Sequence, residues 1–328
     1  MTGAPHPPLE ELLESVRVVA LPLSTRFRGI DVREAMLLRG PSGWTEFSPF
    51  TEYDDVEASA WLAAAIDFGW SEAPALLRDS IPVNATLPAV SPDRVPAVLD
   101  RFPGCRTVKV KVAERGQTLA QDAARVAAAR AWVGASGRIR VDANGGWHVD
   151  EAERALRAFA EFDLEYAEQP CASVAELARL RSRVADLGVP IAADESVRKA
   201  ADPLAVARAG AADLLVVKAQ PLGGISAALE IVREAGLPVV VSSALDTSVG
   251  LSMGAHLAAA VAELPFDCGL GTAALLAADV TETPLAPVDG AVPVRRVEVS
   301  DELATRFAAS EVRALWWRER LARCFALL

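Results

Sequence analysis

The chain has 328 residues, 52% of them hydrophobic and 23% charged, so it is long enough for a barrel and a smaller domain in one globular protein. The formal net charge of −11 and the absence of a Lys/Arg cluster argue against general affinity for nucleic acid or an anionic membrane surface. The N-terminus lacks a basic segment leading into an apolar one, and no apolar run reaches the roughly 18 residues that span a bilayer. A cytoplasmic protein is therefore expected.

The four cysteines are far apart and form no CxxC pair, and only three histidines occur. Neither a zinc site nor a disulfide framework is predicted, and chemistry that needs clustered imidazoles is disfavoured. We expect the cysteines to be packing residues; they are Cys105, Cys171, Cys268 and Cys324.

Residues 1–80 are expected to form a small α+β domain. From about 15 to 55, short apolar runs alternate with polar and glycine-containing turns, which predicts strands joined by hairpins. The stretch "DDVEASAWLAAAIDFGW" has apolar residues at helical spacing and predicts a helix capped by Asp54 or Asp55. A second helix is expected around 72–79.

Residues 81–290 alternate short apolar runs with Ala/Leu/Arg-rich helical stretches. This alternation predicts parallel strands with right-handed crossovers that close into a (β/α) TIM-type barrel. Residues 291–328 are predicted to be a tail whose amphipathic end packs back on the N-terminal domain. The eight runs are "IPVNATL", "TVKVKV", "RIRVDAN", "LEYAEQP", "PIAADES", "DLLVVKAQ", "PVVVSSAL" and "FDCGLGT".

The second run places two lysines, Lys109 and Lys111, on the strand face opposite its valines. A half-exposed antiparallel strand with solvated lysines is one explanation. Both faces of a barrel strand are buried, however, so in a barrel these lysines must serve a site. Only four of the 33 Lys+Arg residues are lysine, and lysine, unlike arginine, can lose its proton and act as a base.

Three acidic residues, Asp142, Glu168 and Asp194, follow successive strands at intervals of 26 residues. One βα unit per interval places the carboxylates side by side at the C-terminal rim of the barrel. Neighbouring carboxylates need a cation, and an all-oxygen ligand set indicates Mg²⁺, with Mn²⁺ as the alternative. The competing explanation is three solvated strand-end residues.

Lys218 lies 24 residues after Asp194, and Lys111 lies 31 residues before Asp142. The rim is therefore expected to carry a lysine, three acids and a second lysine across five strands. This arrangement suits removal of a proton α to a carboxylate, with a metal stabilising the resulting anion. As a neighbouring cation, Lys109 is expected to lower the pKa of Lys111.

The motifs "KVK", "DANGGW", "EQP", "ADES" and "VVKAQPLGG" together resemble the enolase superfamily, in the branch with a Lys-x-Lys motif. The resemblance covers nearly the whole chain and includes a capping domain with "GWTEFSPF". Members use a lysine or histidine base with Mg²⁺. The resemblance implies that Lys111 abstracts the proton and that Lys218 is the opposing cation. It further implies Asp142, Glu168 and Asp194 as metal ligands, with Lys109, Asn144 and Glu195 in support.

Within that branch, the stretch "VVVSSALDTSVGLSMGAHLAAAV" is similar to the o-succinylbenzoate synthases. The implied reaction is the syn dehydration of 2-succinyl-6-hydroxy-2,4-cyclohexadiene-1-carboxylate to 2-succinylbenzoate in menaquinone biosynthesis. N-succinylamino acid racemase activity at the same site, and a non-catalytic binding barrel, are the alternatives. The succinyl tail of this small carboxylate substrate is expected to meet Ser242, Ser243, Gly271 and, in the capping segment "LSTRFRGI", Arg28.

Overall fold

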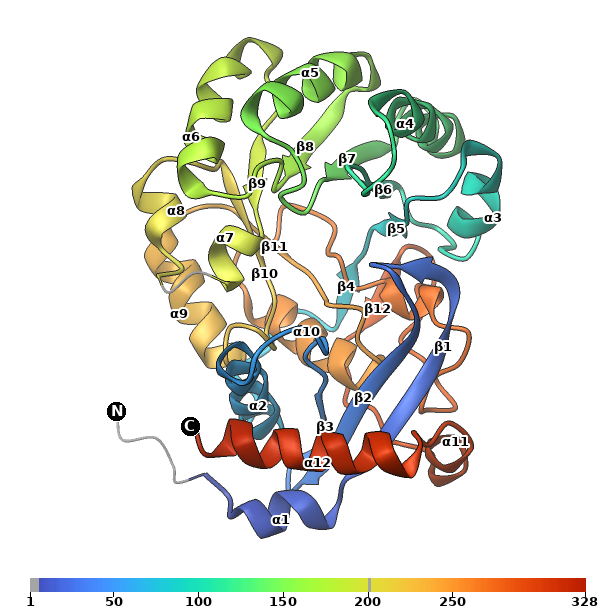
Figure 1. The fold of residues 1–328 in the computed structure, drawn as a ribbon, viewed down its shortest axis with the longest axis vertical. Coiled ribbons are helices and arrows are strands. Elements are labelled where there is room, and N and C mark those ends of the chain that lie inside the picture. The colour runs from blue at the N-terminus through green and yellow to red at the C-terminus, as the bar shows by residue number, and fades with distance from the viewer. Residues whose placement is uncertain (1–5, 200–201) are drawn as a thin grey trace.

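A computed structural model describes residues 6–199 and 202–328 of the chain. A curled sheet ringed by helices forms one part, and a smaller antiparallel sheet with helices α1, α2 and α12 forms the other (Figure 1). The mouth of the curled sheet faces the smaller part, which we call the capping domain (residues 9–70 with α12). This arrangement confirms the predicted barrel with an N-terminal α+β cap.

The barrel sheet has seven hydrogen-bonded strands in the order β11-β10-β9-β8-β7-β6-β5, and every neighbouring pair is parallel. Each of the first seven apolar runs contains one of these strands. A parallel strand in a barrel is buried on both faces, so its sequence is a mostly apolar run and not a regular alternation of apolar and polar residues. The strands are β5 (Ala85–Leu87), β6 (Thr107–Lys111), β7 (Arg138–Asp142), β8 (Leu164–Glu168), β9 (Ile191–Ala193), β10 (Leu214–Val217) and β11 (Val239–Val241).

The eighth expected strand is reduced to two isolated parallel bridges, Val83 with Cys268 and Ser242 with Gly269. The Asn84 amide donates to the Cys268 carbonyl at 2.9 Å, and the Gly269 amide donates to the Val241 carbonyl at 2.8 Å. This segment therefore closes the barrel between its first and seventh strands. It does not extend as a ladder because the chain turns into the 3-10 helix η4 (Thr272–Leu275) directly afterwards.

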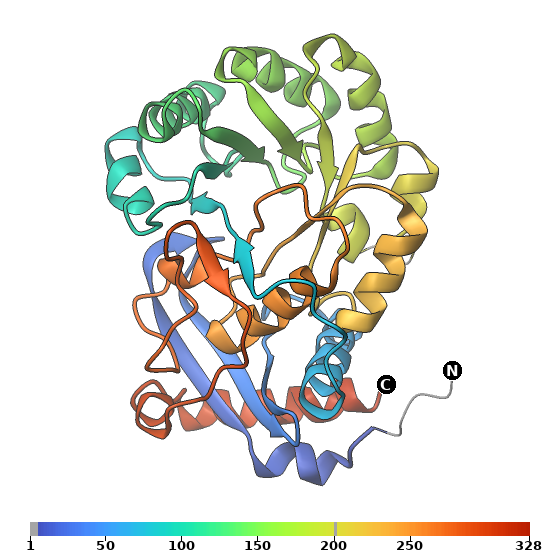
Figure 2. The ribbon, with the colours of Figure 1, turned by 180° about the vertical axis from the view of Figure 1, so that it is seen from behind.

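Helices cover the outer face of the sheet, as the view from behind shows for α4, α5 and α6, drawn in green (Figure 2). Helix α4 begins with a reciprocal capping box between Thr118 and Gln121 and ends at Gly134, whose φ of +74° lies in the region that favours glycine. The helices are α3 (Val95–Leu99), α4 (Leu119–Val133), α5 (Val149–Phe159), α6 (Val174–Arg183), α7 (Glu195–Arg198), α8 (Ala205–Arg208), α9 (Ile225–Ala235) and α10 (Ser248–Ala260).

The capping domain is an antiparallel meander of β1 (Arg17–Phe27), β2 (Ile30–Gly40) and β3 (Gly43–Phe47), packed against α1 (Leu9–Glu14) and α2 (Asp55–Trp70). As predicted, Asp54 caps α2, and its carboxylate accepts the Glu57 amide at 2.8 Å.

The predicted helix at 72–79 is wrong, because the described chain there is irregular. Pro74 has no amide hydrogen to donate, and the Leu77 amide donates at 2.8 Å to the Ala259 carbonyl near the end of α10. The Arg78 guanidinium donates to the carbonyls of Ala258 and Val261, each at 2.6 Å. The segment satisfies the open C-terminal carbonyls of α10 instead of forming its own helix.

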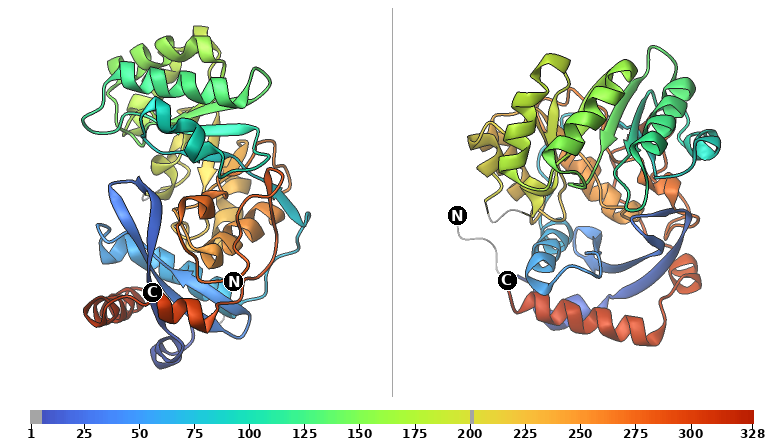
Figure 3. Two further views of the ribbon diagram at one scale, coloured as in Figure 1. Left: turned by 90° about the vertical axis from the view of Figure 1, so that its right-hand side faces the viewer. Right: turned by 45° about the horizontal axis from the view of Figure 1, so that its top comes forward.

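After the barrel, β12 (Ala291–Pro293) pairs with β4 (Ser80–Pro82), and α11 (Asp301–Arg306) leads into α12 (Glu311–Phe325). Helix α12 lies along the end of the molecule farthest from α4–α6 (Figure 3). Trp317 of α12 is fully buried, stacks edge-on against Phe47 at 5.8 Å, and donates to Glu34 at 2.8 Å. The C-terminal helix therefore completes the core of the capping domain.

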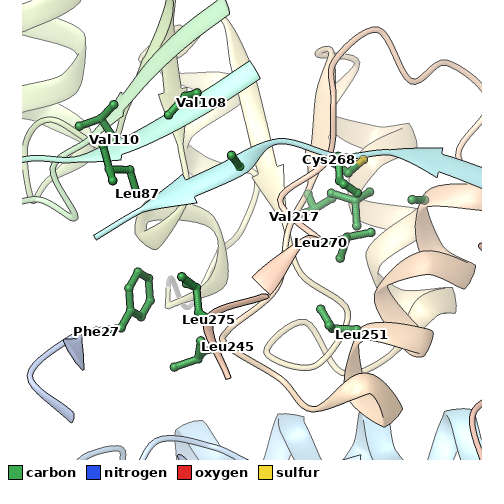
Figure 4. Close-up of a cluster of buried hydrophobic side chains, with 14 of the residues drawn as sticks. Phe27, Leu87, Val108, Val110, Val217, Leu245, Leu251, Cys268, Leu270 and Leu275 are labelled. Carbon is green, nitrogen blue, oxygen red and sulfur yellow. The ribbon is translucent and has the colours of Figure 1, made fainter. Parts of the chain in front are cut away.

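The hairpin between β1 and β2 reaches the barrel mouth. Leu23 forms an isolated bridge with Leu276, and Phe27 belongs to the same buried cluster as Leu245 and Leu275 of the barrel loops (Figure 4). The capping hairpin is thus held against the loops that follow the barrel strands. No helix within residues 6–199 and 202–328 is long and apolar enough to cross a membrane.

Candidate active site

The three predicted metal ligands lie at the carboxyl ends of neighbouring strands. Asp142 ends β7 and pairs in register with Glu168, which ends β8, and with Lys111, which ends β6. Asp194 follows β9 directly and occupies the cap position of α7. All three carboxylates are buried. Residues that are equally spaced in the sequence therefore lie side by side along one rim of the barrel.

Three lysines hold these carboxylates. The Lys109 ammonium lies 3.1 Å from both Glu168 oxygens and 3.5 Å from Asp142 Oδ2. Lys111 pairs with the same Asp142 oxygen, and Lys218 donates to Asp194 Oδ2 at 2.5 Å. The lysine side chains are only 7%, 13% and 10% exposed, which rules out the explanation of a solvated strand face.

The two lysines of β6 differ in how their surroundings act on their pKa values. Burial would lower the pKa of Lys109, but the carboxylates of Glu168 and Asp142 outweigh it and raise that pKa. For Lys111 burial prevails over the attraction of Asp142, and the neighbouring Lys109 ammonium adds to it, so its pKa is lowered. Lys111 is therefore the lysine of this pair that gives up its proton more readily.

The carboxylates also differ in how well their charges are compensated. Burial, and then the Asp142 carboxylate, raise the pKa of Glu168 to about 7. Burial opposes ionisation of Asp142 too, yet Lys111 and Lys109 hold its pKa well below the usual range. Lys218 and Arg198 likewise outweigh burial at Asp194 and lower its pKa to about 2. Of the three, Glu168 lacks sufficient compensating positive charge.

The chemistry of this donor set fits a hard divalent cation, since three carboxylates meet at one rim and Glu168 is short of positive charge. As the side chains lie, no group of three or more His, Cys, Asp or Glu within residues 6–199 and 202–328 is gathered closely enough to hold a metal. Lysine ammonium groups contact oxygens of all three carboxylates. A metal ion would have to take over some of these contacts.

Asn144 and Glu195, which the sequence predicts to be supporting residues, lie next to these groups. The Asn144 amide nitrogen donates to Asp142 Oδ1 at 3.0 Å, and its side-chain oxygen accepts from Lys111 at 2.9 Å. Its side-chain nitrogen donates to Glu195 at 3.2 Å. Asn144 has a φ of +47°, a conformation that asparagine tolerates better than most residues. It therefore links the lysine, one carboxylate and the α7 turn.

A pocket between the barrel and the capping hairpin is lined by most of these groups, namely Lys109, Lys111, Asp142, Asn144, Asp194, Glu195 and Lys218, whereas Glu168 is not among its lining residues. Arg28, Ser242 and Ser243, predicted to meet the substrate, are part of its lining. Gly271 is not among the lining residues, which include its neighbours Gly269 and Thr272. A β-carbon at Gly271 would lie 3.1 Å from the Asn84 carbonyl, so this residue faces packed chain behind the cavity wall.

The sequence interpretation missed two residues that join the capping domain to the loop that carries Asp194. Arg198 donates to Asp194 Oδ1 at 3.1 Å and to the Tyr53 hydroxyl at 3.2 Å. Arg28 donates to the same hydroxyl at 3.4 Å. The position of Arg198 four residues after Asp194, on the same short helix, was the available signal. Nothing in the sequence around Tyr53 pointed to the barrel.

Gln169, the residue after Glu168, was missed as well. Its side-chain oxygen accepts the amides of Asp194 and Ser196 at 3.0 and 3.1 Å, and its nitrogen donates to Ser196 Oγ at 2.7 Å. The side chain is fully buried, so it fixes the start of the loop that carries Asp194. The quoted motif "EQP" contained this signal.

The sequence matches two family models in the same order as the two structural parts. Residues 18–69 match the model described as Enolase N-terminal domain-like, and residues 97–298 match Enolase C-terminal domain-like. The chain belongs to the enolase superfamily. The chain is metal-dependent, as follows from its membership of this superfamily and from its relatives.

Curated relatives match this chain over nearly its whole length. The o-succinylbenzoate synthase of Mycolicibacterium smegmatis is 54% identical over 98% of this chain and 98% of its own. That of Thermobifida fusca is 56% identical over 93% of this chain and 94% of its own. The aligned regions therefore include both the capping domain and the barrel.

Solved structures share the fold at lower identity. Muconate cycloisomerase from Pseudomonas fluorescens aligns with a TM-score of 0.74 and 21% identity over 90% of this chain and 98% of its own. The L-Ala-D/L-Glu epimerase from Bacillus subtilis aligns with a TM-score of 0.72 and 22% identity over 87% and 96%. These similarities support the fold. The reaction has to be inferred from the site and from the more similar relatives.

Proposed function

We propose that the chain is an o-succinylbenzoate synthase, a lyase that dehydrates 2-succinyl-6-hydroxy-2,4-cyclohexadiene-1-carboxylate to 2-succinylbenzoate in menaquinone biosynthesis. The observation that carries this proposal is the identity of 54–56% to curated o-succinylbenzoate synthases over 93–98% of the chain. The cavity supports it, because an anionic substrate would meet the lysines and Arg28 there. The cytoplasmic location stays a prediction of the sequence.

Lys111 is the proposed base. Its neutral amine removes the proton α to the substrate carboxylate, and the electron pair of that C–H bond moves onto the carboxylate group. The resulting Lys111 ammonium then gives the proton to the departing hydroxyl, which leaves as water while the ring double bond forms. One lysine performs both steps because the hydrogen and the hydroxyl leave from the same face.

Lys218 is the proposed cation on the other side of the intermediate. It extends from the end of β10, three strands away from β7 around the curled sheet, and pairs with Asp194, whereas Lys111 pairs with Asp142. A fixed ammonium there stabilises negative charge as it develops. Lys109 stays protonated between Asp142 and Glu168 and disfavours a second charge on Lys111.

Asp142, Glu168 and Asp194 are the residues proposed to hold the divalent metal, Mg²⁺ with Mn²⁺ as the alternative. A metal bound there would act as a Lewis acid toward the substrate carboxylate and lower the energy of the proton-abstraction transition state.

The substrate's succinyl tail is proposed to lie between the β11 loop and the capping hairpin. Ser242 and Ser243 offer hydroxyl groups on one side, and Arg28 offers a guanidinium on the other. Arg28 is held by its stacking on Phe50, 4.2 Å from the ring centroid, and by the Tyr53 hydroxyl.

N-succinylamino acid racemisation is the second candidate. It is favoured by the placement of Lys111 and Lys218 on strands that lie apart around the barrel, since a racemase needs a base on each face of a planar intermediate. A non-catalytic barrel is disfavoured because all five charged rim residues of the motif are present.

A paired assay of purified protein with Mg²⁺ tests the proposal. Dehydration of the cyclohexadiene substrate is followed in the ultraviolet, and deuterium exchange at the α-carbon of N-succinylamino acids is followed by mass spectrometry. Fast dehydration with slow exchange supports a dedicated synthase. Efficient exchange with racemisation assigns both activities to the site, and no dehydration refutes the proposal.

A further inference from the structure

A buried carboxylate of the capping domain caps a barrel helix. Glu46, on β3, is fully buried, and its Oε2 accepts the amides of Thr247 and Gly250 at the start of α10, each at 3.1 Å. It also accepts the Thr247 hydroxyl at 2.5 Å. A β-carbon at Gly250 would lie 2.9 Å from the carboxylate carbon of Glu46. The glycine thus leaves room for a contact between residues 201 positions apart.

A second capping-domain side chain, Arg33 of β2, holds the loop that precedes α10. Its Nε donates to the Leu245 carbonyl at 3.1 Å, and its Nη2 donates to Ser48 Oγ at 3.0 Å. Ser48 Oγ in turn donates to Glu46 Oε1 at 2.5 Å. Leu245 has a φ of +63°, a left-handed conformation that a leucine keeps only where its surroundings enforce it. Glu46 and Arg33 therefore form one buried network that shapes this loop.

The loop held in this way is one wall of the cavity. Ser242, Ser243, Ala244 and Leu245 line it on the β11 side, whereas the lysine and carboxylate groups come from β6 to β10. The hydrogen bonds of Glu46 given above reach the start of α10 and Ser48, and through Ser48 and Arg33 they continue to the Leu245 carbonyl. Glu46 is therefore connected by hydrogen bonds to the loop that forms the substrate-binding wall and to the helix that follows it.

We infer that Glu46 is a positioning residue that sets substrate affinity: from the capping domain it fixes the Ser242–Leu245 wall against which the non-reacting part of the substrate binds. This inference rests on the proposed function for the identity of the substrate. The consequence is that capping-domain docking and the shape of the binding wall are one event, since the same carboxylate takes part in both.

Asp279 offers a matched control at the same helix end. Its carboxylate is also buried and also caps α10, accepting the Ser248 amide at 3.3 Å and the Ser248 hydroxyl at 2.5 Å. It additionally accepts the Val280 amide at 2.7 Å, so these partners lie in the barrel chain and not in the capping domain. Loss of Asp279 weakens the helix start without removing the capping-domain contact.

The kinetic test compares Glu46→Ala, Glu46→Gln and Asp279→Ala in the dehydration assay. Glu46→Ala is expected to raise KM about tenfold or more while kcat changes less than about threefold, because a displaced wall loses ground-state contacts. Glu46→Gln keeps an acceptor at the helix start and is expected to restore KM to within about threefold. Asp279→Ala is expected to lower the melting temperature with KM nearly unchanged. Equal KM increases in Glu46→Ala and Asp279→Ala would overturn the inference.

Gly250→Ala perturbs the same contact from the barrel side and carries the test if Glu46→Ala does not fold. Its new methyl group would lie 2.8 Å from the Asp246 β-carbon, next to the wall, and 2.9 Å from the Glu46 carboxylate carbon, so KM is expected to rise in the same direction. An unchanged KM in this variant would contradict the role of the contact.

Hydrogen exchange of the free protein separates this inference from the proposed function. The Ser242–Thr247 segment is expected to exchange roughly tenfold faster in Glu46→Ala than in wild type, and no faster in Asp279→Ala. This outcome supports positioning even if the wild-type protein fails to dehydrate the proposed substrate, a failure that would refute only the function. Unchanged exchange in Glu46→Ala would refute positioning whatever the substrate.

Discussion

Replacing Lys111 by arginine separates its charge from its ability to act as a base. Arginine keeps a cation beside Asp142 and Asn144, so the ion pair that Lys111 makes in the structure has a substitute. It does not supply a neutral amine at working pH. Lys111→Arg should therefore fold and bind metal while losing the proton-transfer step.

The magnitude follows from the ordinary pKa values, 10.5 for lysine and 12.5 for arginine. Two units reduce the fraction of neutral base about a hundredfold, and geometric mismatch of the planar guanidinium adds to this loss. Because general acid–base catalysis contributes about 10²–10⁴-fold, kcat is expected to fall by at least about 10². Lys111→Ala, which also removes the charge, should fall at least as far.

The assay is single-turnover dehydration with saturating Mg²⁺, accompanied by thermal melts of each variant. Lys199→Arg serves as the matched control, because Lys199 lies over the Tyr53 ring at 4.2 Å and is assigned no part in proton transfer. A Lys111→Arg enzyme that retains kcat within about threefold of wild type would refute the assignment of Lys111 as the base.

Four further outcomes are expected. Chelator-treated protein should be inactive and recover with Mg²⁺, and activity that survives rigorous metal removal would contradict the three-carboxylate site. Lys218→Ala should lower kcat by roughly 10²–10³, as loss of one charge-stabilising group does; near-normal turnover would remove Lys218 from the mechanism. Trp317→Ala should destabilise the protein by about 3–5 kcal/mol in denaturant unfolding, since the ring is fully buried, whereas the half-buried Trp316→Ala should cost much less. Burial lowers the pKa of His256 from 6.5, so the unfolded chain binds more protons and stability should decrease as the pH falls below 6.5; a His256→Gln variant whose acid sensitivity there equals that of wild type would contradict this.

The rim of charged residues could be predicted because it depends on local periodicity. Period two set the two lysines of β6 on one face, and one βα unit per step brought Lys111, Asp142 and Glu168 into register on adjacent strands. Both rules act over a single repeat and need no knowledge of the rest of the chain. The same holds for the start of α2, where Asp54 is followed closely by the amide that it caps.

The errors fall where distant segments compete for local hydrogen bonds. Residues 72–79 have helix-forming side chains, yet Leu77 and Arg78 bond to the end of α10, about 180 residues away. For this segment the missing information was which remote segment lies alongside. Gly271, expected to meet the substrate, is not among the residues that line the pocket, and a β-carbon there would lie 3.1 Å from the Asn84 carbonyl; its contact with the substrate stays a prediction.

The sequence by itself determined the barrel, the order of lysines and carboxylates around its rim and, through its motifs, the superfamily. Only the tertiary structure decided how the cavity is closed: Tyr53 against Arg198, Phe27 over Lys111 at 5.6 Å, and Glu46 at the start of α10. The physical reason is that strand and helix periods are set by neighbouring residues, whereas docking of the cap joins side chains some 85 to 200 positions apart. No local period encodes such a contact, and it exists only once both domains have folded against each other.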